Sequence, residues 1–208
     1  MKKSTIIIML LGAFLTAMLP GCSEGNSEMD YSVTITLDNQ MQHDSATLLV
    51  LEEGYNKLRS CGTVGKTDNS FVFTGQTNAP RVAIVRWDND STKPFYFVLE
   101  GGVTHISVTP NSWTVRGSEQ SAEYLRYVNQ RNAIMDLRVA TWQEYLKMAA
   151  DSSLKPDDEL RMVRQDSLLN DSLQRITVDR INRGDAVGRI IRERYGQQLD
   201  QEHMRMIK

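Results

Sequence analysis

One stretch of this sequence has most of the residues of a phosphate-binding loop. The run from Ser60 to Thr67, SCGTVGKT, ends in the Gly-Lys-Thr with which a P-loop holds the phosphates of a nucleotide. Ser60 stands where that pattern requires glycine, and the residues after Thr67 predict a turn and a strand instead of a helix whose N-terminus faces the phosphates. We therefore interpret the run as a hairpin turn and not as a nucleotide site.

A second stretch contains the residue types of a hydrolytic triad. His43, Asp44 and Ser45 are consecutive in the chain. A working triad is assembled from distant segments, because adjacent side chains point in different directions and cannot form the proton relay. We interpret these residues as part of a loop.

A third stretch begins like a calcium-binding loop. The run from Asp88 to Ser91, DNDS, matches the start of an EF-hand loop. Such a loop would then require Gly at position 93 and Glu at position 99, where this chain has Lys93 and Leu99. A turn between two strands is the better interpretation.

The histidines do not have the spacing of metal ligands. His43, His105 and His203 fall in a predicted loop, a strand and the C-terminal turn, and a metal site would require them to converge. We expect the imidazole of His105 to face solvent, since Ile106 and Val108 belong to the opposite, apolar face of its strand. The sequence therefore assigns no metal, no cofactor and no catalytic residue.

The N-terminus has the pattern of a lipoprotein export signal. Lys2 and Lys3 precede an apolar run of about 14 residues, roughly 21 Å as a helix, which is too short to span a bilayer. The following residues, Leu19-Pro20-Gly21-Cys22, resemble a lipobox, whose cysteine becomes the first mature residue and carries lipid on its sulfur. We expect residues 1–21 to be a signal peptide and Cys22 to be lipidated. The alternative is an uncleaved anchor helix with an incidental cysteine.

The residues after Cys22 predict a tether and a location. The polar run without periodicity is expected to make 22–30 a flexible tether. Ser23 stands where an Asp retains many lipoproteins in the inner membrane, which by analogy favours the outer membrane, on its periplasmic or surface face. Loss of Lys2 and Lys3 changes the formal charge from −2 to about −4, which gives no electrostatic attraction for nucleic acid.

Cys61 is the side chain whose chemistry the sequence leaves open. Once Cys22 carries lipid, Cys61 is the only remaining thiol, so an intramolecular disulfide is excluded. Its thiol could contact a partner, or it could be buried on a strand face as a small apolar side chain, which we favour. Without a Cys-x-x-Cys motif the chain alone cannot run a dithiol redox cycle.

Residues 31–117 are predicted to form eight short strands. Val33, Ile35 and Leu37 alternate with polar residues at the period of a half-buried strand. The remaining segments are separated by Gly, Pro, Asn and Asp, and together they predict an antiparallel β-sandwich or a partly open barrel. These segments are Ala46–Glu53, Leu58–Val64, Ser70–Gly75, Arg81–Trp87, Pro94–Glu100, Val103–Val108 and Trp113–Arg116.

Residues 118–208 are predicted to be helical, which makes the fold class α+β. A first helix from Ser121 to Ala150 and a second from Pro156 to Ile181 are followed by two short ones with Asp185 and Asp200 as N-caps. The first helix carries an apolar stripe of Tyr124, Val128, Met135, Val139, Trp142 and Leu146. Four aromatic residues could line a ligand groove, but we expect them in the core: Tyr124, Trp142, Tyr145 and Tyr195.

Three motifs give the chain a resemblance to a known family. They are Phe71-Val72-Phe73-Thr74-Gly75, Phe97-Val98-Leu99-Glu100-Gly101-Gly102 and Val115-Arg116-Gly117-Ser118. In this order they are similar to the domain of unknown function that precedes thioredoxin-like (AhpC/TSA or TlpA-type) domains in lipoproteins of Bacteroidota. The stretch from Asn182 to Lys208 resembles the region that leads into the thioredoxin part.

Two departures from that family bear on function. Ser60-Cys61 stands where members often carry Asp-Ser, and Lys208 ends the chain where the thioredoxin fold would start, so its redox Cys-x-x-Cys has no counterpart. We therefore expect a non-enzymatic, lipid-anchored binding or interaction module of the envelope. The alternative is an accessory domain that acts in trans with a thioredoxin-like protein and contacts it through Cys61. A purely structural envelope protein would share every one of these features.

Overall fold

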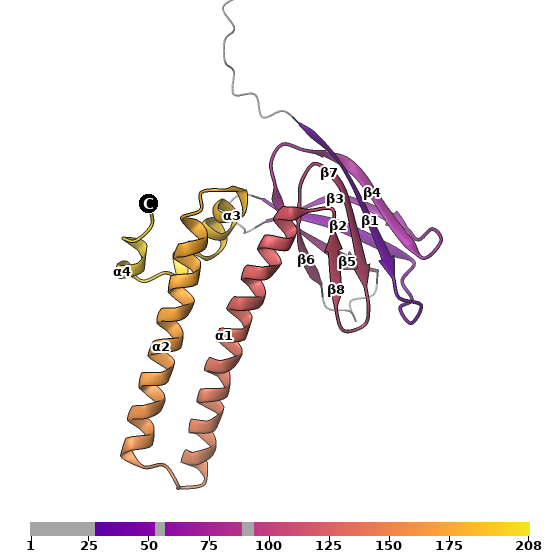
Figure 1. The fold of residues 1–208 in the computed structure, drawn as a ribbon. Helices are drawn as coiled ribbons and strands as arrows, with labels where there is room; N and C mark the ends of the chain where they lie inside the picture. Colours follow the sequence, from indigo (N-terminus) through magenta and orange to yellow (C-terminus); the bar gives the residue numbers. More distant parts are fainter. Residues whose placement is uncertain (1–27, 53–56, 89–93) are drawn as a thin grey trace, which may run out of the picture.

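The structure, a computed structural model, describes residues 28–52, 57–88 and 94–208. Strands come first along the chain and helices follow, so the α+β class is confirmed (Figure 1). The strands are β1 (Met29–Leu37), β2 (Ser45–Leu51), β3 (Leu58–Gly65), β4 (Ser70–Thr77), β5 (Arg81–Trp87), β6 (Phe95–Leu99), β7 (Gly102–Val108) and β8 (Trp113–Arg116). The helices are α1 (Glu119–Ala150), α2 (Pro156–Ile181), α3 (Ala186–Tyr195), the 3-10 turn η1 (Gly196–Gln198) and α4 (Gln201–Met204).

The strands form two four-stranded sheets, which makes the first part of the chain a sandwich and not a barrel. The strand orders are β4-β1-β7-β8 and β3-β2-β5-β6. Every pair is antiparallel except β1 with β7, which run parallel. The predicted antiparallel sandwich is therefore confirmed, with this pair as the exception. A parallel pair needs a long connection, and here the chain passes through both sheets between β1 and β7.

The sandwich core follows the alternation that the sequence predicts for β1. Side chains of this strand that point between the sheets are buried, and β1 begins at Met29 because Met29 and Asp30 pair with Thr77 and Gln76. The strand thus includes two residues that were expected to belong to the tether. The core is made of Tyr31, Val33, Ile35, Leu37, Met41, Ala46, Leu48, Val50, Phe71, Phe73, Ala83, Val85, Trp87, Phe95, Phe97, Leu99, Ile106 and Val108.

The turn between β3 and β4 carries the chain from one sheet to the other. Asp68 and Asn69 have positive φ values of 47° and 64°, and the two residues are bracketed by a bridge between Thr67 and Ser70. Beyond this bridge β3 pairs with β2 and β4 pairs with β1. The predicted turn is confirmed, but the hairpin is not, because its two strands belong to opposite sheets.

The start of α1 is fastened to the edge strand β6. Ser118 is the N-cap and its Oγ accepts a hydrogen bond of 2.9 Å from the Ser121 amide, while it donates to the Glu100 carboxylate. Ser121 Oγ accepts from the Val98 amide (2.9 Å) and donates to the Val98 carbonyl (3.0 Å). These bonds satisfy part of the free edge of the sheet and set the direction of the helix.

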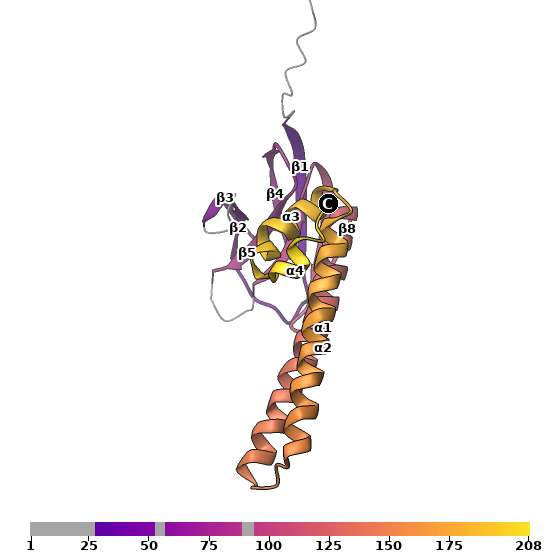
Figure 2. The same cartoon turned by 90° about the vertical axis from the view of Figure 1, so that its left-hand side faces the viewer.

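Helices α1 and α2 form a long antiparallel hairpin, and the short helices α3 and α4 follow it. Helices α1 and α2 lie side by side in both views, and α3 and α4 lie at the base of this hairpin (Figures 1 and 2). The predicted caps Asp185 and Asp200 are confirmed, since they accept hydrogen bonds from the amides of Gly188 (2.7 Å) and His203 (2.9 Å). Within the described ranges, no helix combines the length and the apolarity needed to cross a membrane.

A second core joins the helices to the outer side of the β5–β6 sheet. Val82 and Val98 on these strands point away from the sandwich interior and are fully buried under α1 and α3. The remaining members come from the helical part, and they are Tyr124, Tyr127, Val178, Ile181, Val187, Ile190, Ile191 and Leu199.

Candidate interaction surface

The triad-like stretch is a structural anchor for the loop that precedes β2. The carboxylate of Asp88 accepts hydrogen bonds from the amides of Asp44 (2.8 Å) and Ser45 (3.2 Å), and it contacts Nδ1 of His43 at 3.2 Å. The imidazole of His43 is 4% exposed and stacks on Trp87 with ring centroids 4.7 Å apart. His43 therefore lies in a loop, as expected, but its side chain is packed.

Four predicted features fall wholly or partly beyond the described part of the chain. The lipobox, with Cys22, and the signal peptide over 1–21 lie outside the described residues. The same holds for 22–27 of the tether and for all of the calcium-like run except Asp88. These assignments stay predictions.

The three histidines lie in separate places. His105 on β7 faces solvent, as predicted from its strand position. His203 on α4 is 4% exposed, with Nδ1 2.8 Å from Asp200 and Nε2 3.2 Å from Asp171. In the described ranges, no group of three or more His, Cys, Asp or Glu residues is arranged to hold a metal ion. The burial of His203 was not predicted, because the carboxylate on α2 is 32 positions away in sequence.

Cys61 lies on β3, an edge strand of its sheet, and is half-buried. Its thiol is hydrogen-bonded to the hydroxyl of Tyr31 in the sandwich core, and burial together with this thiol raises the pKa of Tyr31. The predicted burial of Cys61 on a strand face is thus met only in part, because its side chain is half-buried. Edge strands have a neighbour on one side alone, which leaves part of the Cys61 side chain open.

The four aromatic residues expected in the core fall into two groups. Tyr124 is 1% exposed and Tyr195 is half-buried near the base of the hairpin. Tyr145 is half-buried on the distal part of α1, where its ring meets that of Trp142 edge-on at 5.6 Å. Trp142 is 42% exposed, so its assignment to the core is wrong. The reason is its position on α1, beyond the level at which α3 covers the hairpin.

The predicted apolar stripe of α1 changes character along its length. Tyr124 is in the second core and Val128 packs against it. Met135 is half-buried, and from Val139 onward the same stripe is exposed, with Leu146 at the far end 63% exposed. One helical face thus continues from the interior of the protein into solvent.

Part of α2 extends this exposed stripe on the same side of the hairpin. Met135 and Asn170 both line a cavity of about 200 Å³ that α3 and η1 close with Tyr195 and Gln198. Helical spacing places Val163 on the side of α2 that carries Asn170. We call this set the outer face, and it consists of the half-buried Met135 with the exposed Val139, Trp142 and Leu146 from α1 and the exposed Leu160 and Val163 from α2.

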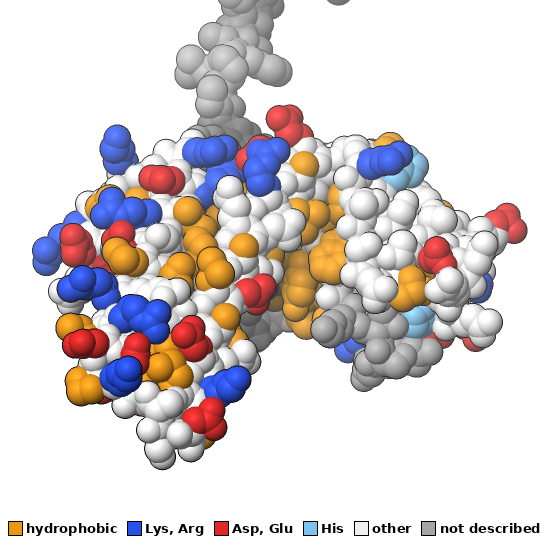
Figure 3. Space-filling view, turned by 60° about the horizontal axis from the view of Figure 1, so that its bottom comes forward, with side chains coloured by type: hydrophobic (Ala, Val, Ile, Leu, Met, Phe, Trp, Pro, Cys, Tyr) orange, Lys and Arg blue, Asp and Glu red, His pale blue; other side chains and the backbone are white. Residues whose placement is uncertain are grey.

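Charged side chains lie around and among the hydrophobic side chains of the helical hairpin (Figure 3). Looking toward the tip of the hairpin, Figure 3 shows hydrophobic side chains among acidic and basic ones over the helical part. Arg138 pairs with Asp166 across the two helices through hydrogen bonds of 2.8 and 3.1 Å. These bonds, with a further one from Trp142, hold the pKa of Asp166 below its usual value. The charges of Arg138 and Asp166, which lie beside the outer face, therefore compensate each other.

Comparisons with known proteins identify the family of the first part of the chain. No curated protein matches this sequence. The crystal structure of a proposed cell adhesion protein from Bacteroides ovatus ATCC 8483 matches 44% of this chain and 44% of its own, with 12% identity and a TM-score of 0.26. That likeness is too low to support an argument about fold or function. The family model "Domain of unknown function (DUF4369)" matches residues 31–124, from Tyr31 of β1 to Tyr124 of α1. The family resemblance expected from the three motifs is confirmed: the sandwich and the first turns of α1 are a DUF4369 domain.

Proposed function

We propose that this protein is a lipid-anchored, non-enzymatic interaction module of the cell envelope that binds a protein partner through the outer face. The observation that carries this proposal is the exposure of large apolar side chains on one side of the helical hairpin. Leu146 and Leu160 are 63% and 62% exposed there, and Trp142, which is 42% exposed, lies on the same side of α1 as Leu146. A contiguous apolar patch with an aromatic residue and few charges is typical of the centre of a protein interface.

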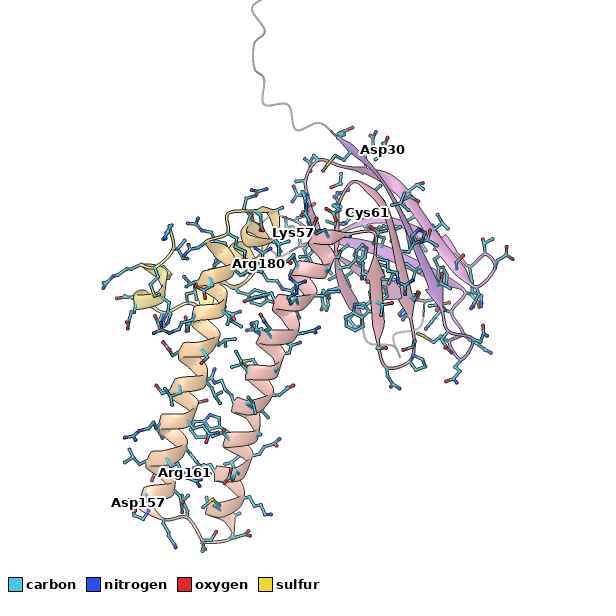
Figure 4. All side chains as sticks on the ribbon, in the orientation of Figure 1. Asp30, Lys57, Cys61, Asp157, Arg161 and Arg180 are labelled. Carbon is cyan, nitrogen blue, oxygen red and sulfur yellow. The ribbon has the colours of Figure 1, made fainter. Side chains whose placement is uncertain are left out.

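The position of the anchor supports the same proposal. Asp30 lies at one end of the molecule, whereas Asp157 and Arg161 mark the tip of the hairpin at the other (Figure 4). Lipid on Cys22 would be at most about 25 Å from Met29, since seven residues cannot extend further. An anchor of that length keeps the start of β1 within about 25 Å of the lipid, and the tip of the hairpin lies at the other end of the molecule (Figure 4), where a partner can reach the outer face.

A site-specific crosslink in cells tests this proposal. A photoreactive amino acid replaces Leu146 on the outer face, and in a matched control it replaces Leu168, which is equally exposed at 63% but lies on the other side of α2. We expect a crosslinked protein species from position 146 and none from position 168. Equal yields at both positions, or no product at 146, would contradict binding through the outer face.

The anchor is tested separately with Cys22→Ala. We expect the wild-type chain to incorporate a labelled fatty acid and to sediment with membranes, and the variant to do neither. A wild-type chain that a salt wash releases from membranes would remove the lipid anchor from the proposal.

A second candidate function is supported by Cys61. Its half-buried thiol on an edge strand is accessible enough for a mixed disulfide with a thioredoxin-like protein acting in trans. Trapping tests this function with a thioredoxin-like protein whose single remaining active-site cysteine carries a small thiol in disulfide linkage. The Cys61 thiolate attacks that disulfide and the small thiol leaves, so a mixed disulfide forms, and Cys61→Ser is the control. A thiol that does not react with a small alkylating reagent in the folded protein would exclude it.

A further inference from the structure

Helix α1 carries two neighbouring apolar stripes along its length, which we call seams. Helix α2 packs against only one of them. Thr141 is buried and Tyr145 is half-buried on the seam that packs against α2. The α1 members of the outer face lie about a quarter of a turn further round the helix, at spacings of four, three and four residues. Two adjacent seams on one helix are typical of bundles with three or more helices. The second seam of α1 is therefore open for packing by helices that do not belong to this hairpin.

The outer face is uncharged, so two copies of it can approach each other without electrostatic repulsion. Its six side chains are uncharged, and on α2 the face continues toward the base with Ser167 and Asn170. In a two-fold symmetric contact, residues near the axis meet their own copies, so a face of one charge would repel itself. Because the neighbouring Arg138 is already held by Asp166, two outer faces can meet without burying an unpaired charge.

The size of the outer face is sufficient for a weak dimer. The exposed fractions of Val139, Trp142, Leu146, Leu160 and Val163, between 42% and 63%, correspond to on the order of 500 Å² of apolar surface per chain. Two copies would together bury about 1,000 Å², which is the lower limit for specific association. We expect reversible pairing with a Kd in the micromolar range.

We propose that two copies of this chain pair through their outer faces, with antiparallel hairpins, as a four-helix bundle with two helices from each copy. This rests on the proposed function, because it names the partner of the same face. The antiparallel arrangement comes from α3 and η1: α3 lies at the base of the hairpin (Figure 2), and Tyr195 and Gln198 of these two segments line a cavity there together with Met135. In a parallel pair these two segments would collide, whereas in an antiparallel pair each lies beyond the tip of the other hairpin.

Sedimentation equilibrium of the full chain in a density-matched detergent tests the pairing. We expect the wild-type protein to dimerise at tens of micromolar, and Leu146→Asp to weaken dimerisation at least about tenfold, because it buries a charge beside its own copy. Val163→Asp should have the same effect from α2. The control Leu168→Asp adds the same charge at the same exposure and should leave the dimer unchanged. Thermal unfolding followed by circular dichroism verifies that each variant is folded.

The possible outcomes separate this inference from the proposed function. A wild-type chain that stays monomeric up to about 100 µM overturns the dimer, as does an equal loss of dimer in Leu146→Asp and Leu168→Asp. If the chain is monomeric and the photoreactive residue at position 146 captures a different envelope protein, the dimer is wrong and the proposed function stands. If position 146 captures nothing and the chain is monomeric, both are wrong.

Discussion

The sandwich and the helical hairpin use the same kind of sequence signal with different results. In β1 the apolar side chains at the strand period from Tyr31 to Leu37 are all buried, because a second sheet covers the inner face of this part of the strand. In α1 the apolar stripe is covered by the sheet and by α3 only as far as Val128. Apolar periodicity thus specifies which face of an element seeks a partner, and it does not specify whether the partner belongs to the same chain.

The largest effect that this comparison predicts is in the sandwich core. Phe97 is completely buried, so Phe97→Ala should lower the free energy of unfolding by about 3–5 kcal/mol. Val72 on β4 is 47% exposed, and Val72→Ala should lower the free energy of unfolding much less than Phe97→Ala does. Urea unfolding of both variants measures the difference, and similar losses would show that the outer surface of the sandwich is also a packed interface.

The buried and the exposed end of the apolar stripe of α1 should respond differently to substitution. Tyr124→Ala at the buried end should lower the free energy of unfolding by about 3 kcal/mol. Leu146→Ala at the exposed end should change it by about 0.5 kcal/mol or less when the protein is dilute and monomeric. A loss above about 1.5 kcal/mol for Leu146→Ala would mean that the outer face is already covered.

The junction between the two regions has a smaller predicted effect. Ser118→Ala removes the N-cap of α1 and its hydrogen bond to Glu100. We expect it to lower the free energy of unfolding by about 1 kcal/mol. Ser153, which is exposed in the turn after α1, provides a control, because Ser153→Ala removes one surface hydrogen bond. If the two variants are equally stable in thermal unfolding, the cap does not set the start of the helix.

The smallest predicted effect concerns acid pH and the hairpin. Because Arg138 lowers the pKa of Asp166 in the folded protein, this pair contributes stability above the unfolded pKa of about 3.9 and loses it as the pH falls through the lower folded value. Asp166→Asn should therefore destabilise the protein at pH 7 and have little effect near pH 2. Urea unfolding at both pH values measures this, with the exposed Asp136→Asn as the control. An equal effect of Asp166→Asn at the two pH values would contradict the role of the pair.

Features with a local physical cause could be predicted from the sequence. The bounds of β5 and β8 match those expected from alternation and turn residues, and the N-caps Asp185 and Asp200 make their predicted bonds. Each of these depends on residues a few positions apart. The family resemblance, carried by glycine and aromatic motifs at turns of the sandwich, was found in the same way.

Features that depend on distant segments could not be predicted. The parallel pairing of β1 with β7, the carboxylates on both sides of His203 and the exposure of Trp142 each require knowing which elements meet. The stripe that contains Trp142 was recognised, but it was assigned to the core because an apolar helical face usually packs within its own chain.

The sequence by itself determined the strands, the helices, their caps and the faces that are apolar, because these depend on side-chain period and on short-range hydrogen bonds. Only the tertiary structure decided which apolar faces are buried. Helix α1 is 32 residues long, and the sheet and α3 cover only its first part. The free energy of burying the remaining stripe is therefore available to a binding partner, and this possibility arises from the length of the hairpin relative to the body that supports it.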